Sequence, residues 1–193
     1  FRSSTSPLYG NYLLLDGLKN SYPGKYTIAI TSDWQAVSFF EKNGNKKGLA
    51  IAHNNLATNY GRLGDLENQK LNLLKAIDIN KSLGYTYPLI MNYNNLGSNY
   101  KQTNQIEKAL TYYAKVSPNR LNNSNAEYLN FQIGYSYFAL EKWKESITAF
   151  KKVVANKESK YFGPGNYYLG MGYFKEKNYK DALSSFKAIE DVK

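Results

Sequence analysis

The sequence predicts an all-α solenoid of about five helix-turn-helix units, and three observations predict it. Small residues recur at Gly17, Ala57, Gly97, Gly134 and Gly170, with separations of 40, 40, 37 and 36 residues. Recurrence at such a period is the signature of a repeat architecture. Within each interval the apolar residues follow three- and four-residue steps, which mark one face of a helix. No alternation of strand type persists anywhere in the 193 residues.

The first unit, expected at about 9–43, is degenerate. Its helices are predicted near 9–20 and 26–43, and Gly17 takes the small position of the first helix. Asn20 stands where later units have an aromatic residue, and Asp33 stands where they have a large residue of the second helix. The unit therefore keeps the spacing of the repeat without its usual side chains.

The four later units match one another more closely. An aromatic residue follows the small residue by three positions, which keeps both on one helix face; these are Tyr60, Tyr100, Tyr137 and Tyr173. Sixteen positions after the small residue come the large residues of the second helix, Leu73, Tyr113, Phe150 and Phe186. We expect one solenoid over residues 1–193, with these units at about 49–82, 89–118, 125–157 and 163–191.

This pattern resembles the tetratricopeptide repeat. It is clearest in LGSNYKQTNQIEKALTYYAKV (96–116), IGYSYFALEKWKESITAFKKV (133–153) and LGMGYFKEKNYKDALSSFKAI (169–189). The longer units resemble those of kinesin light chains and bacterial sensor-associated proteins, and the last two resemble repeats of bacterial envelope-assembly proteins. The resemblance implies a right-handed superhelix whose first helices line a concave groove for a partner protein or peptide.

In the middle units the groove-side residues that the resemblance implies are polar. They are Asn54, Asn55, Thr58, Arg62, Asn94, Asn95, Ser98, Lys101 and Gln102. A carboxamide has two N–H donors and one acceptor, so the paired Asn residues suit the main chain of an extended peptide. The alternative is that one Asn of each pair bonds to the neighbouring helix.

In the last two units the groove-side residues are mostly aromatic. They are Tyr128, Phe131, Gln132, Tyr135, Phe138, Tyr167, Tyr168, Met171, Phe174 and Lys175. Contiguous exposed aromatic side chains mark an interaction site, here a trough for apolar side chains of a ligand. The alternative is that a capping helix outside this sequence covers them.

Catalytic chemistry is not expected. The absence of Cys excludes disulfides, thiolate catalysis and Cys-based metal sites, and does not separate a cytoplasmic from a periplasmic protein. The only histidine, His53, falls at a packing position, and no phosphate-binding loop is present. Asp65 and Glu67 lie at a helical corner without a base partner, and are expected to be solvated. The sequence predicts no enzyme, no cofactor and no metal site.

The positive charge of the chain favours acidic partners or anionic surfaces, and the alternative is that it is simply a solvated, lysine-coated surface. Lys and Arg number 25 against 15 Asp and Glu, for a net charge of +10. The basic residues are spread without a dense run, which disfavours nucleic acid as the main partner. No apolar stretch approaches the roughly 18 residues of a membrane-spanning helix, so no such segment is expected.

The function predicted from the sequence is a non-catalytic scaffold that binds an extended peptide or partner segment in its groove. It would form part of a larger bacterial protein or envelope assembly. One alternative is a regulatory sensor array fused to a signalling output domain. A second alternative is RNA binding, in which aromatic side chains stack on single-stranded bases.

Overall fold

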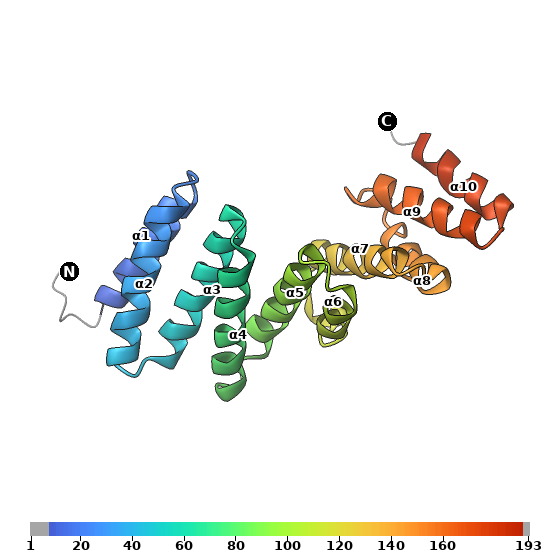
Figure 1. The fold of residues 1–193 in the computed structure, drawn as a ribbon. Coiled ribbons are helices and arrows are strands. Elements are labelled where there is room, and N and C mark those ends of the chain that lie inside the picture. Colours follow the sequence, from blue (N-terminus) through green and yellow to red (C-terminus); the bar gives the residue numbers. More distant parts are fainter. Residues whose placement is uncertain (1–7, 191–193) are drawn as a thin grey trace. The chain divides into compact units, whose positions relative to one another are not determined.

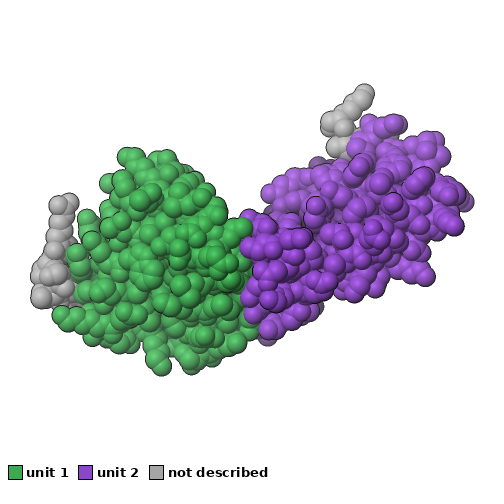
Figure 2. Space-filling view, in the orientation of Figure 1, with its two compact units in different colours: residues 1–99 green, residues 100–193 purple. Residues whose placement is uncertain are grey.

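The computed structural model describes residues 8–190, and within that range it contains ten α-helices, one short 3-10 helix and no strand (Figure 1). The predicted all-α class is therefore confirmed. The chain divides into two compact units, residues 1–99 (unit 1) and residues 100–193 (unit 2), which Figure 2 colours separately.

Unit 1 holds the first hairpins of the chain. Its helices are α1 (Tyr9–Ser21), α2 (Tyr26–Lys42), α3 (Lys46–Leu63), α4 (Leu66–Ser82) and most of α5 (Thr86–Gln102). Helix α2 packs against α1 and α3, and α3 packs against α4. Leu13, Val37, Phe40 and Leu56 belong to the apolar core that these helices share.

Unit 2 holds the remaining helices. They are α6 (Ile106–Tyr113), the 3-10 helix η1 (Pro118–Arg120), α7 (Asn123–Ala139), α8 (Trp143–Val153), α9 (Phe162–Lys175) and α10 (Tyr179–Glu190). Helix α8 packs against α7 and α9, and α10 packs against α9. Ile147, Phe150, Val153 and Leu169 form its apolar core, and partly buried aromatic residues surround it. No helix of the described residues 8–190 combines the length and the apolar character needed to cross a bilayer.

The recurring small residues allow close approach by the large residue of the next helix. A Cβ atom at Gly134 would lie 2.9 Å from the Phe150 ring, and one at Gly170 would lie 2.6 Å from the Phe186 ring. In the first unit a Cβ at Gly17 would lie 2.5 Å from the Asp33 carboxylate, so the same steric pairing is made with a polar side chain. Burying one such aromatic side chain stabilises the fold by about 1.5–3 kcal/mol.

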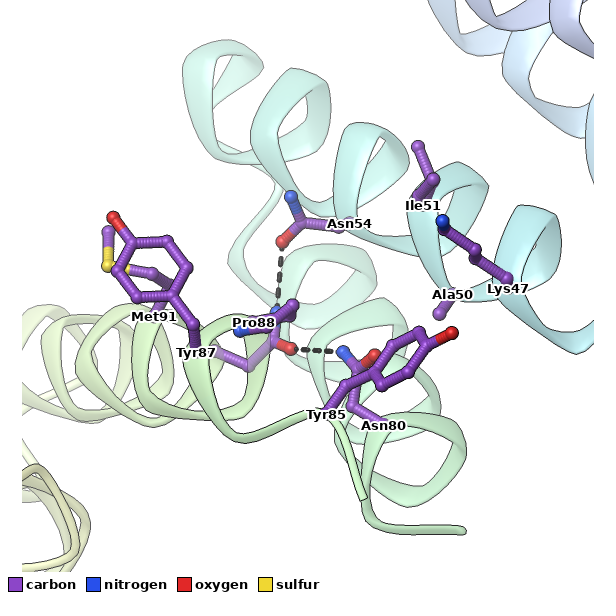
Figure 3. A pocket seen from close by; sticks show the side chains of 10 residues that line it. Lys47, Ala50, Ile51, Asn54, Asn80, Tyr85, Tyr87, Pro88 and Met91 are labelled. Carbon is purple, nitrogen blue, oxygen red and sulfur yellow. Dashed lines mark hydrogen bonds between the residues drawn. The ribbon is translucent and has the colours of Figure 1, made fainter. Parts of the chain in front are cut away.

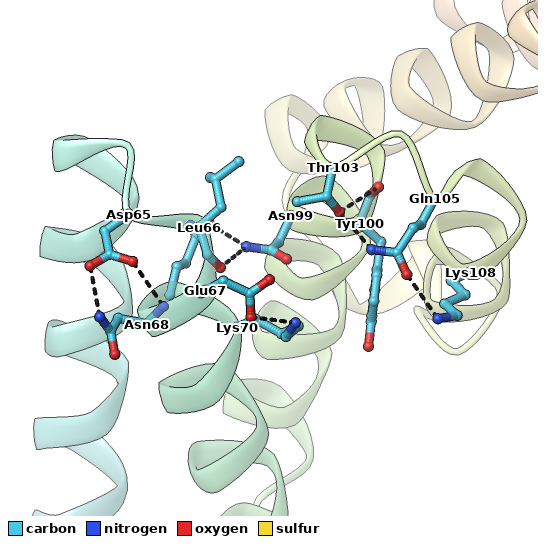
Figure 4. Close-up of polar contacts among 11 residues, drawn as sticks. Asp65, Leu66, Glu67, Asn68, Lys70, Asn99, Tyr100, Thr103, Gln105 and Lys108 are labelled. Atoms are coloured by element: carbon cyan, nitrogen blue, oxygen red, sulfur yellow. Dashed lines mark hydrogen bonds and ion pairs between the residues drawn. The ribbon is translucent and has the colours of Figure 1, made fainter.

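Side-chain caps start several helices. The Asp65 carboxylate accepts a hydrogen bond from the backbone N–H of Asn68 at 3.1 Å and a second from its amide at 2.7 Å (Figure 4). These two bonds lower the pKa of Asp65. Asp65 also has a structural role that the sequence did not predict, because its oxygen satisfies a free N–H at the start of α4. Glu67, two residues on, is ion-paired with Lys70 at 2.7 Å.

Candidate functional site

The single histidine is a structural residue. His53 is buried, and its Nδ1 lies 2.9 Å from the Asn72 Oδ1. The edge of the Trp34 ring meets the imidazole, with centroids 6.2 Å apart. Burial lowers the pKa of His53, which favours the neutral ring. Within residues 8–190 no three His, Asp or Glu side chains gather in a way that could hold a metal ion.

The four Asn residues of the two predicted pairs, all in unit 1, differ in burial and in hydrogen bonding. Asn54 Oδ1 accepts a hydrogen bond of 2.9 Å from Asn92 of α5, so this amide does bond to a neighbouring first helix. Asn55 donates to the Asp33 carboxylate over 3.4 Å, a long and weak bond. Asn94 is buried, with only 4% of its surface exposed, while Asn95 is half-buried. The two pairs therefore do not present four equivalent amides to solvent.

The other predicted residues of unit 1 lie nearer the surface. Thr58 is exposed and donates to the Asn54 carbonyl at 3.0 Å. Arg62 is exposed as well, donates to the Ser21 hydroxyl at 3.1 Å, and lies 5.6 Å from the centre of the Tyr26 ring. Ser98 is half-buried.

Lys101 is the most constrained predicted cation of unit 2. It is half-buried, donates to the Gln132 side-chain carbonyl, and lies over the Tyr135 ring at 4.9 Å from its centre. Burial lowers the pKa of Lys101. Gln132 is itself buried, whereas Gln102 is exposed. The Lys101 ammonium is thus held between an amide oxygen and an aromatic face.

The predicted aromatic residues come together on α7 and α9. Tyr168 is their centre: its ring stacks on Phe150 at 5.5 Å and meets Tyr135 and Phe138 edge-on at 5.4 and 5.2 Å. Burial raises the pKa of Tyr168, and the nearby Tyr135 and Tyr167 raise it further. The phenol therefore stays neutral well into the alkaline range.

The remaining predicted rings surround this centre. Phe131 lies 6.1 Å from Tyr168 and 5.3 Å from Tyr161, and Tyr128 lies 6.1 Å from Tyr161. Tyr167 packs edge-on against Tyr168 while half of its surface stays exposed. The aromatic cluster is therefore continuous from the core of unit 2 to its surface.

A cavity of about 480 Å³ opens beside the aromatic cluster; we call it the aromatic cavity. Its lining residues are Tyr135, Phe138, Ala139, Glu141, Trp143, Tyr168, Met171 and Lys175. Five of them, Tyr135, Phe138, Tyr168, Met171 and Lys175, are groove-side residues that the resemblance implied. The Lys175 ammonium lies 5.8 Å from the centre of the Trp143 ring, at the edge of the cavity.

A second cavity, of about 310 Å³, lies in unit 1 between α3 and the start of α5; we call it the amide cavity (Figure 3). Its lining residues are Lys47, Ala50, Ile51, Asn54, Asn80, Tyr85, Tyr87, Pro88, Met91 and Asn92. Among these only Asn54 was expected to face a ligand. The sequence signal that could have indicated this cavity is the stretch with Tyr85, Tyr87 and Pro88, in which aromatic residues follow the end of a helix.

Models of the tetratricopeptide repeat match three stretches of the sequence, residues 50–83, 92–117 and 128–156. These three stretches are tetratricopeptide repeats. They fall on α3 and α4, on α5 and α6, and on α7 and α8. No curated protein matches the chain by sequence.

Solved structures of other repeat proteins are similar in fold. BtubC (BKLC) from P. vanneervenii is 14% identical with a TM-score of 0.78, over 95% of this chain and 79% of that one. The repeats of a putative kinesin light chain from Podospora anserina are 13% identical, with a TM-score of 0.78, over 97% and 96%. The apo form of RapI is 17% identical with a TM-score of 0.80, over 95% and 69%.

These similarities confirm the predicted fold class, an all-α solenoid of tetratricopeptide-like repeats. Repeats of this type are interaction scaffolds, and their fold is typically non-catalytic. At 13–17% identity the neighbours show the fold alone. The choice of partner therefore has to be argued from the side chains of this chain.

Proposed function

We propose that the chain is a non-catalytic interaction module that binds an extended segment of a partner protein at the aromatic cavity of unit 2. The observation that carries this proposal is the lining of that cavity. Tyr135, Phe138 and Trp143 supply ring surfaces, Met171 supplies an adaptable apolar side chain, and Lys175 supplies a cation at the edge. Aromatic side chains of this kind dominate the binding energy of protein interfaces.

The apolar surface continues beyond the cavity. Phe174 of α9 is 52% exposed and lies 5.5 Å from the Tyr179 ring, which is 59% exposed. Together with Tyr167, Phe174 extends the aromatic surface along α9, and Tyr179 adds an exposed ring at the start of α10. An extended segment could thus place one apolar side chain in the cavity and others along the helix, which favours a peptide over a single small molecule.

Charge supports an acidic character for this segment. Within residues 8–190, neither Lys175 nor Lys101 has a carboxylate partner within 4.0 Å, although Glu141 also lines the cavity. A carboxylate of the ligand would complement Lys175 at the edge of the cavity. A partner contact by the other groove residues of α3 and α5 stays a prediction; these include Thr58, Arg62, Asn95 and Gln102.

The context that we propose is a larger bacterial protein or envelope assembly in which this chain recruits its partner. A regulatory array fused to an output domain is the alternative. A fused kinase or DNA-binding domain in the full reading frame would favour that alternative. RNA binding has less support, because the rings of the aromatic cluster pack largely on one another rather than in a row on the surface.

The test is a selection of binding peptides from a random library displayed on phage, with the whole chain as bait. Peptide affinity is then measured by fluorescence anisotropy for the native chain and for Lys175→Glu and Met171→Ala. We expect enriched peptides with apolar and acidic residues, and weaker binding to both variants. Reversing a charge at an edge position costs about 1 kcal/mol, or roughly fivefold in Kd.

Lys187→Glu is the matched control, because it makes the same charge change at an exposed lysine of α10 that does not line the cavity. It should leave the affinity unchanged. Circular dichroism of each variant establishes that the helices are intact. Failure to enrich any peptide, or equal binding to Lys175→Glu and to the native chain, would refute the proposal.

A further inference from the structure

The amide cavity of unit 1 has an apolar wall and a polar floor. Its apolar lining comes from Ala50 and Ile51 of α3, from Tyr85 just before α5, and from Tyr87 and Met91 of α5, which are drawn together in Figure 3. Tyr85 and Tyr87 are 38% and 55% exposed, and Ile51 is 42% exposed. A volume of about 310 Å³ is at the lower end of ligand sites, on the order of 300–1,000 Å³, and suits a group of one aromatic ring.

The floor is a chain of three amides that fixes its own orientation. Asn80 donates to the Asn92 oxygen at 2.9 Å, and Asn92 donates to the Asn54 oxygen at 2.9 Å. Asn80 and Asn92 are 3% and 1% exposed, so both side chains are held in the interior. The Asn54 nitrogen lies on the side of its amide away from Asn92 (Figure 3), and it has no acceptor among the described residues.

The charge around this cavity has one sign. Lys47 lines it, and no Asp or Glu is among its lining residues. Helix α5 begins at Thr86, so Tyr87 and Pro88 belong to its first turn, which carries no acidic residue. The start of a helix adds a partial positive charge. An anionic group is therefore the complement that the cavity lacks.

We infer that the amide cavity binds a carboxylate attached to an apolar group of about one aromatic ring. The carboxylate pairs with Lys47, and the ring packs against Ile51, Tyr85 and Met91. Asn54 donates to a second acceptor where the ligand has one. The source is either a free aromatic acid or an aromatic residue beside an acidic residue in a peptide. This inference stands independently of the aromatic cavity.

The two methionines of the chain make the test direct, because Met91 lines the amide cavity and Met171 lines the aromatic cavity. The whole chain is labelled with ¹³C-methyl methionine and titrated with two probes, 3-phenylpropionate and N-acetyl-Phe-Glu-amide. We expect either probe to shift the Met91 methyl resonance saturably. Lys47→Gln should weaken that binding about two- to fivefold.

Matched controls separate the charge and the source of the ligand. Lys46→Gln changes the adjacent exposed lysine, which does not line the cavity, and should leave binding unchanged. The neutral 3-phenylpropanol and N-acetyl-Phe-Gln-amide should bind more weakly than the acids. Asn54→Asp keeps the acceptor for Asn92 but adds a negative charge to the lining, so it should weaken the binding of both acids.

A response to one acid alone supports the inference and identifies the source. It is overturned if neither acid shifts Met91 saturably. It is also overturned if the neutral probes bind as well as the acids, or if Lys47→Gln and the native chain bind the acids equally. A null result here leaves the aromatic cavity untouched, because Met171 reports on that site separately.

Discussion

Unit 1 and unit 2 follow one repeat pattern but fill it with different chemistry. The interior of unit 1 is rich in amides and other polar groups. His53 is hydrogen-bonded to Asn72 of the next helix, and Asp33 accepts a hydrogen bond from Asn59. The interior of unit 2 is mainly aromatic, with Phe150 and Tyr113 fully buried. The repeat therefore specifies side-chain size and spacing, while polarity at the same positions is free to vary.

The pairing of small and large residues shows this most clearly. Gly134 faces Phe150 and Gly170 faces Phe186, whereas Gly17 faces Asp33. Asp33 is fully buried and accepts hydrogen bonds from Asn59 at 2.9 Å and, more weakly, from Asn55 at 3.4 Å. Asn59 accepts in turn from Ser21 at 2.6 Å, and Arg62 donates to that serine. A polar network thus replaces one aromatic ring.

The largest effect is expected where the aromatic core is broken. Phe150→Ala removes the ring that stacks on Tyr168 and faces Gly134, and should lower the free energy of unfolding by about 3–5 kcal/mol. Urea denaturation followed by circular dichroism measures the change. Phe174→Ala is the control, because half of that ring is exposed, and a loss as large as that of Phe150→Ala would contradict the account.

The polar counterpart at Asp33 should respond to pH. Burial raises the pKa of Asp33 to about 7 in the folded state, from 3.8, so folding favours the protonated acid. Stability from this group is fully present below pH 3.8 and is lost as the pH rises through about 7. Three pH units correspond to about 4 kcal/mol at most.

Asp33→Asn should remove most of this dependence and raise the melting temperature at pH 8. Thermal unfolding of both proteins between pH 5 and pH 8 is the measurement. Parallel pH profiles for the native chain and the variant would show that Asp33 does not titrate in this range.

Removal of the buried His53–Asn72 hydrogen bond should have an intermediate effect on the free energy of unfolding. Asn72→Ala leaves His53 Nδ1 buried without its partner at 2.9 Å and should cost about 1–3 kcal/mol. Ser146→Ala in unit 2 is the comparison. It removes a 3.0 Å hydrogen bond from the Ser146 hydroxyl to the Gly134 carbonyl, so the group that loses a bond is a backbone acceptor rather than a histidine ring. Urea denaturation of both variants should show the larger loss for Asn72→Ala.

The smallest effect is expected at the helical corners. Unit 1 turns at glycines with positive φ, such as Gly64 at 79°, whereas unit 2 uses Asn104, Glu141 and Lys177 at 57–60°. A side chain in this left-handed region costs about 1–2 kcal/mol. Gly64→Ala should therefore destabilise by about 1 kcal/mol, and Lys177→Gly should stabilise slightly. Equal destabilisation by both changes would contradict this difference between the glycine turns of unit 1 and the non-glycine turns of unit 2.

The sequence was sufficient to predict the class of fold, because small and large residues recur at fixed helical offsets. It also indicated that aromatic residues such as Tyr135 and Tyr168 lie on the first helices of the last two units, and five of the eight residues that line the aromatic cavity are among those it named. It did not predict the amide cavity, whose walls join a turn at Tyr85 to residues of α3 that lie 31 to 38 positions earlier, from Lys47 to Asn54. Nor did it predict that Asp33 accepts hydrogen bonds, because the donors Asn55 and Asn59 are 22 and 26 residues away in the sequence.

The central claim is that a partner segment binds on the first-helix face of unit 2. Methyl NMR of ¹³C-labelled Met171, titrated with a peptide selected against the whole chain, tests it most directly. We expect the Met171 resonance to shift saturably, with a Kd equal to that from fluorescence anisotropy. An unchanged Met171 resonance at saturating peptide would contradict it.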